Sequence, residues 1–194
     1  MHISHVKIRS IKCSVRIPFA IDLSFVKERC EETNTKIVTY PNFIVFSKIG
    51  IEAVPKDFNS NIKFTLFRYG GKLKSQHCNI CGITKRKHVP ICIKLLAQLI
   101  QVKKSKLSLT IDNLCATTSL PTKINKLLFI KANPTAFQQF ERFPAIFLRS
   151  RTKVVLLIYA SGAVVFSGAK ETKQISEASK YLEKCYVKYK NMIQ

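Results

Sequence analysis

The stretch that decides the fold is residues 143–170, where FPAIFLR (Phe143–Arg149) is followed, after four residues, by VVLLIYASGAVVFSGAK (Val154–Lys170). Its apolar residues are interrupted by Ser161-Gly162, a pair typical of a hairpin turn. The runs on either side are rich in β-branched and aromatic residues, which favours strands over helices. The stretch therefore predicts strands at Ala145–Leu148, Lys153–Ala160 and Ala163–Ser167, the last two joined by a hairpin.

A weaker copy of this pattern lies earlier in the chain. Tyr40–Ile44 matches Phe143–Phe147 at an offset of 103 residues, and Ile8–Cys13 matches Ile111–Ala116 at the same offset. Single positions that also share it are Pro18 with Pro121, Ile21 with Ile124, and Asp22 with Asn125. Later the first copy carries extra residues, so the offset falls to 92 between Phe67 and Tyr159 and to 86 between Gly82 and Gly168. Separated motifs that share one offset indicate an internal duplication.

Each copy reads as a strand, a helix, a run of four strands and a closing helix. Opening strands are predicted at residues 5–15 and 106–117, and Pro18 and Pro121 predict the starts of the first helices. The other predicted strands are Thr35–Thr39, Phe43–Phe46, Ile62–Phe67, His77–Ile83 and Phe137–Phe140. The closing helices are predicted at about 89–102 and along a buried face formed by Ile175, Ala178, Leu182, Cys185 and Tyr189.

We therefore predict an α+β fold with pseudo-twofold symmetry, in which both copies share one antiparallel sheet. Residues 1–102 form the first copy, with a loop insertion at 49–61, and residues 103–194 form the second. Helices are expected on one face of the sheet, which leaves the other face open to a ligand.

Charge is the dominant feature of the composition. The chain of 194 residues carries 33 Lys and Arg against 11 Asp and Glu, a formal net charge of +22. Such an excess favours a polyanionic partner, above all nucleic acid. A membrane role is disfavoured, because the longest apolar run, Val154–Phe166, is interrupted and too short to span a bilayer. Seven cysteines without a signal-peptide core after Met1 predict reduced thiols in an intracellular protein.

The residues of the second copy resemble a known family. Phe143–Arg149, Val154–Lys170 and the upstream Ile111-Asp112-Asn113-Leu114 look like the second repeat of TATA-box-binding proteins. The resemblance is specific over residues 106–190, and over 5–102 it rests mainly on the duplication. It implies a saddle, whose curved antiparallel sheet sits on a widened minor groove while apolar side chains wedge between base steps and kink the duplex.

The resemblance also implies a set of DNA-binding residues. The wedges of the second copy would be Phe143 and Tyr159, and their first-copy counterparts are Tyr40 and Phe67. Asn113 and Ser167 would line the centre of the site, where the first copy has Ser10 and Cys81 instead. Cations expected to neutralise phosphates are Arg149, Lys153 and Lys170, and the offset of 103 places Phe46 at the first-copy equivalent of Arg149. Because Ser10 and Cys81 depart from the family pattern, strict TATA preference is open.

A partner surface follows from the same resemblance. In the family, acidic and apolar residues just before the second-copy wedge contact transcription factor IIB. Here Glu141 is retained and Arg142 replaces the expected leucine, which suits a divergent paralogue or a viral relative.

One motif suggests different chemistry. Cys78-x2-Cys81, with His88 and Cys92, has residue types that bind zinc. However, positions three apart on a strand face opposite sides, so buried thiols are the favoured interpretation and no metal is expected. No carboxylate pair, nucleophile motif or phosphate-cradling loop stands out either, so the chain is not expected to be an enzyme or to need a cofactor.

The sequence thus predicts a protein that binds and bends A·T-rich double-stranded DNA through the minor groove in transcription initiation. Initiation factors such as transcription factor IIB would be its partners, and its site of action would be the nucleus or the intracellular site of viral transcription. The alternative is a saddle-fold interaction protein that binds a protein partner, RNA, or DNA without TATA specificity.

Overall fold

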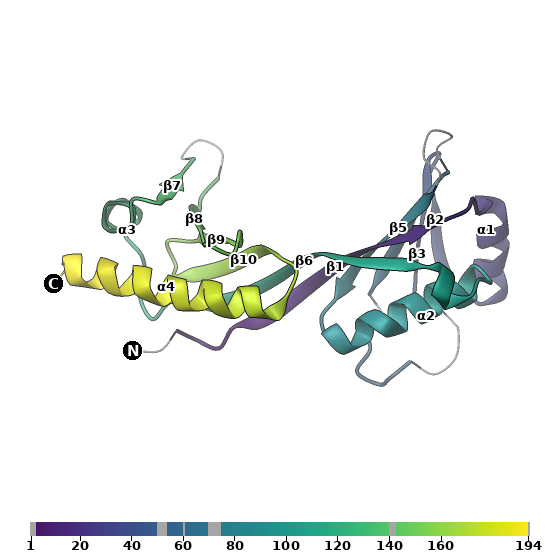
Figure 1. The fold of residues 1–194 in the computed structure, drawn as a ribbon, viewed down its shortest axis with the longest axis horizontal. Coiled ribbons are helices and arrows are strands. Elements are labelled where there is room, and N and C mark those ends of the chain that lie inside the picture. Colours follow the sequence, from purple (N-terminus) through teal and green to yellow (C-terminus); the bar gives the residue numbers. More distant parts are fainter. Residues whose placement is uncertain (1–2, 50–53, 60, 70–74, 140–142, 194) are drawn as a thin grey trace. The chain divides into compact units, whose positions relative to one another are not determined.

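A computed structural model describes residues 3–49, 54–59, 61–69, 75–139 and 143–193 (Figure 1). Contacts divide the chain into two compact units. One comprises Ser10–Asp112, and the other comprises Asn113–Gln194 together with Met1–Arg9. They are called here the first-copy unit and the second-copy unit.

The first-copy unit is an antiparallel sheet in the order β2-β3-β4-β5-β1, with two α-helices. Its strands are β1 (Lys7–Ile17, of which the first residues belong to the other unit), β2 (Lys36–Thr39), β3 (Phe43–Ser47), β4 (Lys63–Phe67) and β5 (Gln76–Ile83). Its helices are α1 (Leu23–Glu32) and α2 (Val89–Leu99), with short 3-10 turns η1 (Arg86–His88) and η2 (Lys104–Lys106).

The second-copy unit repeats this arrangement in the order β6-β10-β9-β8-β7. Its elements are β6 (Ser108–Ser119, which begins in the other unit), α3 (Lys126–Ala132), β7 (Ala136–Gln138), β8 (Ile146–Arg149), β9 (Val155–Ile158), β10 (Ala163–Ala169) and α4 (Thr172–Ile193). Figure 1 shows α4 as the long yellow helix that runs along this unit. The order of elements agrees with the predicted α+β duplication.

The core of each unit lies between its sheet and its helices. Alternate strand residues are buried on the helix side, among them Phe46, Phe64, Leu156 and Phe166. The predicted face of the last helix is confirmed, because Ile175, Ala178, Leu182, Cys185 and Tyr189 are all buried. The remaining strand residues form the opposite face, called here the open face. No helix within the described ranges has the length and apolar character needed to cross a membrane.

Backbone details repeat between the units. Gly82 and Gly168 both adopt a left-handed conformation, with φ of 90° and 89°, near the ends of equivalent strands. The pairing of each opening strand also shifts register, between Ile11 and Cys13 where β1 pairs with β5 and between Phe166 and Ala169 where β10 pairs with β6, and in both cases the extra residue lies in the later strand. These matching irregularities indicate that the duplication extends to positions at which the two sequences differ.

The predicted starts of the first helices are wrong. Pro18 and Pro121 both precede the helices, which begin at Leu23 and Lys126. The starts are set by Asp22 and Asn125, whose side chains accept hydrogen bonds from the backbone N–H groups of Ser24 (3.0 Å) and Leu128 (3.2 Å). Such caps satisfy donors that have no partner within the helix, and these bonds decide where the helix begins.

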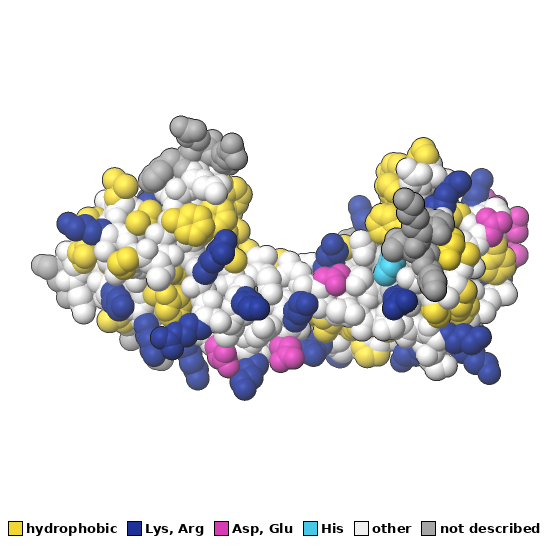
Figure 2. Space-filling view, turned by 45° about the horizontal axis from the view of Figure 1, so that its top comes forward, with side chains coloured by type: hydrophobic (Ala, Val, Ile, Leu, Met, Phe, Trp, Pro, Cys, Tyr) yellow, Lys and Arg dark blue, Asp and Glu magenta, His cyan; other side chains and the backbone are white. Residues whose placement is uncertain are grey.

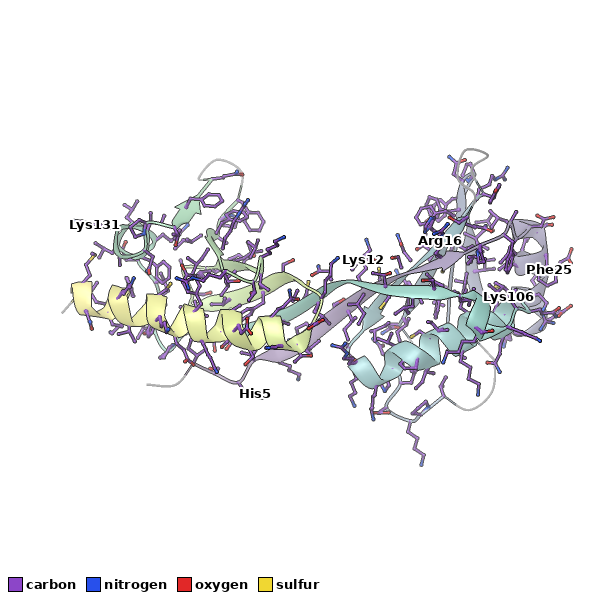
Figure 3. All side chains as sticks on the ribbon, viewed as in Figure 1. His5, Lys12, Arg16, Phe25, Lys106 and Lys131 are labelled. Carbon is purple, nitrogen blue, oxygen red and sulfur yellow. The ribbon has the colours of Figure 1, made fainter. Side chains whose placement is uncertain are left out.

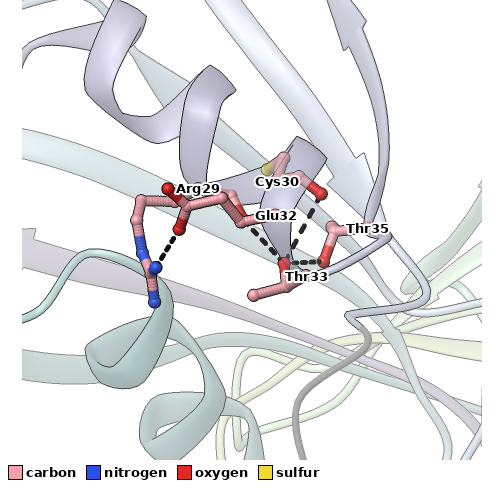
Figure 4. A network of polar contacts seen from close by, with 5 residues as sticks. All are labelled: Arg29, Cys30, Glu32, Thr33 and Thr35. Carbon is pink, nitrogen blue, oxygen red and sulfur yellow. Dashed lines mark hydrogen bonds and ion pairs between the residues drawn. The ribbon is translucent and has the colours of Figure 1, made fainter.

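The end of α1 is fixed by a threonine (Figure 4). The Thr33 hydroxyl donates to the Arg29 carbonyl at 2.8 Å and also hydrogen-bonds the Thr35 hydroxyl at 2.8 Å. Arg29 forms an ion pair with Glu32 in the same turn. Thr35 lies immediately before β2, so this network joins the last turn of the helix to the edge strand of the sheet.

The register of the strands corrects the alignment of the two copies by one residue. Ile44 lies opposite Leu66, and Ile146 lies opposite Ile158. Leu66 and Ile158 each precede the aligned Phe67 and Tyr159, so Ile44 corresponds to Ile146 and the offset in these strands is 102. Phe46 therefore corresponds to buried Leu148, and the counterpart of Arg149 is Ser47. The expectation that Phe46 replaces Arg149 is wrong, because Phe46 is 0% exposed and stacks on Phe64.

Candidate nucleic-acid interface

The open face of the second-copy unit is largely apolar. Strand pairing aligns Phe147, Leu157, Val165 and Thr117 in one row across β8, β9, β10 and β6. A neighbouring row contains Arg149, Val155 and Ser167. All but the exposed Arg149 are half-buried, whereas the residues between them in the strands are buried against the helices.

An aromatic cluster lies at one end of this face. The ring centroids of Phe143 and Tyr159 are 6.4 Å apart, and those of Phe143 and Phe147 are 5.5 Å apart. Phe137 stacks on Phe147 at 5.3 Å and is 39% exposed. The structure thus brings the two predicted wedge residues together. Sequence reasoning missed Phe137 and Phe147, although Phe147 lies four positions after Phe143, a spacing at which strand residues share a face.

The first-copy unit has a second aromatic cluster. Tyr40 stacks on Phe43 with ring centroids 4.5 Å apart, and Phe43 lies opposite Phe67 at 5.8 Å. Tyr40 is 45% exposed and Phe67 is 37% exposed. The two predicted residues are therefore joined by Phe43, which the sequence analysis did not select. In each unit, hydrophobic side chains gather at the surface beside a stretch drawn in grey (Figure 2).

The predicted central residues of the second copy are held by hydrogen bonds. The Gly168 backbone N–H donates to Asn113 Oδ1 at 2.7 Å, which orients the side-chain amide. Asn113 Nδ2 then points toward Cys115 Sγ at 3.3 Å and Ser167 Oγ at 3.5 Å. The amide therefore presents its donor group, rather than its carbonyl, beside the hydroxyl of Ser167.

Their first-copy counterparts are not linked in this way. Ser10 is half-buried and Cys81 is exposed, and within the described residues no hydrogen bond joins their side chains. Cys81 lies opposite Lys63 in the pairing of β4 with β5. The centre of the first-copy face therefore has different polar groups from that of the second.

The predicted cations of the second copy are all exposed. Arg149 ends β8, Lys170 follows β10, and Lys153 lies in the turn between β8 and β9 with a left-handed φ of 66°. In addition, Arg9 Nε donates to Thr117 Oγ1 at 2.9 Å, which adds a cation that sequence reasoning did not select. The sequence feature that could have identified Arg9 is its position on the opening strand, next to Ser10.

The first-copy face has its own basic groove of about 700 Å³. Lys36 and Lys63 lie on either side of Ser47 in register, and Lys48 also lines the groove. On β1 the exposed Lys12 and Arg16 alternate with buried Cys13 and Val15 (Figure 3).

Two further predictions concern partners and metal. Glu141 and Arg142, the expected partner-binding pair, lie outside the described residues. Cys78 is buried and Cys81 is exposed on opposite sides of β5, and burial raises the pKa of the Cys78 thiol. His88 lies instead near Asp57, with Nε2 at 3.4 Å from Oδ1. Across the described parts of the chain, no group of three or more His, Cys, Asp or Glu side chains is placed to bind a metal.

Comparisons with known proteins agree with this geometry. The family model described as transcription factor TFIID (or TATA-binding protein, TBP) matches residues 108–186. The TATA-box-binding protein of Thermococcus celer is 37% identical over 75 residues, which are 38% of this chain and 40% of that protein. That of Thermococcus kodakarensis is 37% identical over 78 residues, 40% of this chain and 41% of that protein. The matched segment thus spans well under half of either relative.

The likeness in fold extends over nearly the whole chain. The solved structure of Methanococcus jannaschii TBP matches with a TM-score of 0.64 at 24% identity, covering 96% of this chain and 99% of that one. This match confirms the predicted two-copy α+β fold. The second copy is therefore similar in sequence to the TATA-box-binding protein family, and the chain as a whole shares the fold of a TATA-box-binding protein.

Proposed function

We propose that the chain binds A·T-rich double-stranded DNA through the minor groove and bends it in transcription initiation. The observation that carries the proposal is the aromatic cluster at one end of each open face. Tyr40, Phe67 and Phe137 each leave more than a third of their surface in water. Aromatic groups left exposed at the end of the open face in both copies indicate an interface, because a core would bury them.

The chemistry of the second-copy face supports the minor groove. That groove presents hydrogen-bond acceptors at A·T pairs, and guanine adds a donor. The Asn113 amide holds its donor group beside the Ser167 hydroxyl on the half-buried open face, and Val155, Leu157 and Val165 offer close apolar contact. Such a face fits a groove floor of acceptors, while Phe143 and Tyr159 are placed to enter base steps at its end.

Cations around this face fit contacts to phosphate. Arg149, Lys153, Lys170 and Arg9 are exposed, and the chain carries a net charge of +22. The affinity should therefore fall steeply with salt, with a slope set by the number of phosphates neutralised. In this proposal the chain acts where transcription begins, and initiation factors of the transcription factor IIB class are its expected partners.

The direct test measures bending by fluorescence energy transfer between dyes at the two ends of a short duplex. We expect transfer to rise when the protein binds an A·T-rich duplex and to rise much less on a G·C-rich duplex of equal length. Raising the salt should weaken both complexes. Equal, salt-sensitive binding to both duplexes without a change in transfer would contradict the proposal and support the alternative, an interaction protein without A·T preference.

Two thiols report which faces the DNA covers. Cys81 is exposed and Cys115 is half-buried on the open faces, whereas Cys13, Cys30, Cys78, Cys92 and Cys185 are buried. Burial raises the pKa of Cys13 and Cys30 to about 11 and that of Cys92 to about 12, so these groups form little reactive thiolate. We expect iodoacetamide to label Cys81 and Cys115 in the free protein, and the A·T-rich duplex to slow both reactions at least several-fold.

Mass spectrometry of the digested protein gives the labelling rate at each cysteine. The matched control is the G·C-rich duplex at a salt concentration that prevents binding, where both rates should equal those of the free protein. Unchanged labelling of both thiols under saturating A·T-rich DNA would show that the DNA binds elsewhere.

A further inference from the structure

The two open faces differ in their middle rows. In the second copy the row is Leu157, Val165 and Thr117, since Val165 pairs with both of the others. In the first copy the equivalent row is Thr65, Asn79 and Ser14, because Asn79 pairs with both. Asn79 thus occupies the position of Val165, and an amide stands where the other copy has an aliphatic side chain.

The surroundings of Asn79 are also more polar than those of Val165. Lys63 occupies the position of Val155, so a cation replaces a second aliphatic group. The Ser14 hydroxyl donates to Asp112 Oδ1 at 2.9 Å, whereas the equivalent contact in the other copy runs from Arg9 to Thr117. The first-copy face therefore combines an amide, a carboxylate and a cation where the second is mostly aliphatic.

Asn79 has an unused hydrogen-bonding side chain. It is half-buried on the open face, and among the described residues its amide makes no hydrogen bond. A carboxamide holds one carbonyl acceptor and two N–H donors. On a strand in the middle of a sheet, an amide without partners is less favourable than valine, which has the higher strand propensity. On this open face the amide is available to a ligand that supplies both kinds of group.

The floor of the minor groove supplies both kinds. Guanine carries an amino donor at N2, while every base pair offers acceptors at N3 or O2. Under Val165 and Leu157 a guanine N2 group would lose its water without gaining an acceptor, which is unfavourable. Under Asn79 the same group meets the Oδ1 acceptor, and Nδ2 remains free to donate to a neighbouring O2 or N3.

We propose, on the basis of the function proposed above, that the two copies select different base pairs: the second copy requires A·T, whereas the first copy accepts a G·C pair through Asn79. The preferred site is then asymmetric, and its orientation along the DNA fixes the orientation of the protein.

The test uses four duplexes that are identical except for the base pairs under the two halves of the site. One has A·T pairs in both halves, two have a G·C pair in one half or the other, and one has a G·C pair in both. We expect G·C to weaken binding about tenfold or more in one half and less than threefold in the other. The tolerant half is the one beneath the first copy.

Reciprocal substitutions identify the residue responsible. Asn79→Val should make a G·C pair as unfavourable in the tolerant half as it is in the other half. The affinity for the duplex with G·C in the tolerant half should fall about tenfold, and the affinity for the all-A·T duplex should not change. Val165→Asn is the matched variant, and it should relax the requirement in the other half. If Val165→Asn lowers the melting temperature, Asn79→Ser provides a second test. Serine keeps a hydrogen-bond acceptor, so this variant should retain part of the tolerance for G·C in the first-copy half.

Each outcome separates the two proposals. If no duplex is bound selectively or bent, the proposed function fails. If the all-A·T duplex is bent but G·C weakens binding equally in both halves, the proposed function stands and only the proposed difference in base-pair selection between the two copies fails. If one half is tolerant and Asn79→Val leaves it so, the assignment to Asn79 is overturned.

Discussion

Replacing Phe143 and Tyr159 together with alanine is expected to abolish bending of an A·T-rich duplex. The two rings lie 6.4 Å apart at the end of the second-copy face, where they can enter a base step. Stacking of an aromatic side chain on a base contributes roughly 1–3 kcal/mol, so the double substitution should weaken binding by roughly 2–6 kcal/mol. Energy transfer in the end-labelled duplex measures the bend, and titration of the same signal gives the affinity.

The remaining protein–DNA contacts provide the controls for this result. Arg149, Lys153 and Lys170 are unchanged in the double variant, so residual binding should keep nearly the same dependence on salt. Tyr181→Ala removes another partly exposed aromatic ring, but from α4, and should bend the duplex like the unmodified protein. Full bending by the Phe143→Ala, Tyr159→Ala variant would show that these rings are not wedges.

A second large effect is expected on stability. Phe46→Ala should lower the free energy of unfolding by about 3–5 kcal/mol, the usual result of removing a buried phenyl ring. Phe46 is 0% exposed, and its ring lies parallel to that of Phe64 at 5.2 Å. Urea unfolding followed by circular dichroism gives the change in free energy, provided that the slope of the transition is unaltered.

The adjacent residue is the matched control for Phe46. Ser47 is half-buried on the open face, and Ser47→Ala should change stability by no more than about 0.5 kcal/mol. If Phe46→Ala left stability unchanged and weakened DNA binding instead, Phe46 would belong to the interface. The register that equates it with Leu148 would then be incorrect.

Much of the fold followed from local patterns. The three- and four-residue spacing of Ile175, Ala178, Leu182, Cys185 and Tyr189 predicted the buried face of α4, and the β-branched and aromatic runs on either side of Ser161-Gly162 predicted the strands and turn within Val154–Lys170. The aligned pairs Phe143 with Tyr159 and Tyr40 with Phe67 also proved to lie in common clusters, the first pair in direct contact and the second through Phe43. These patterns were informative because helix and strand periodicity depends on residues close together in the chain.

Other features depended on residues far apart in the chain. An offset of 103 placed Phe46 beside Arg149 in the alignment. The pairing of β3 with β4 and of β8 with β9 shows instead that the first copy has one additional residue by this point, so the offset here is 102. A shift of one residue exchanges the two faces of a strand, so the alignment alone exchanged a core phenylalanine for an exposed cation. The starts of α1 and α3 likewise depended on which side chain caps the helix, not on the prolines four residues earlier.

By itself the sequence determined the duplication, the α+β class and the aromatic residues at the end of each face, because repeats and periodicity are written along the chain. Only the tertiary structure decided that Phe43 and Phe147 join those clusters and that Asn79, the counterpart of Val165, lies on the open face in one row with Thr65 and Ser14. Those relations arise from hydrogen bonds between strands, whose register is set by pairing across the sheet and not by neighbours in sequence.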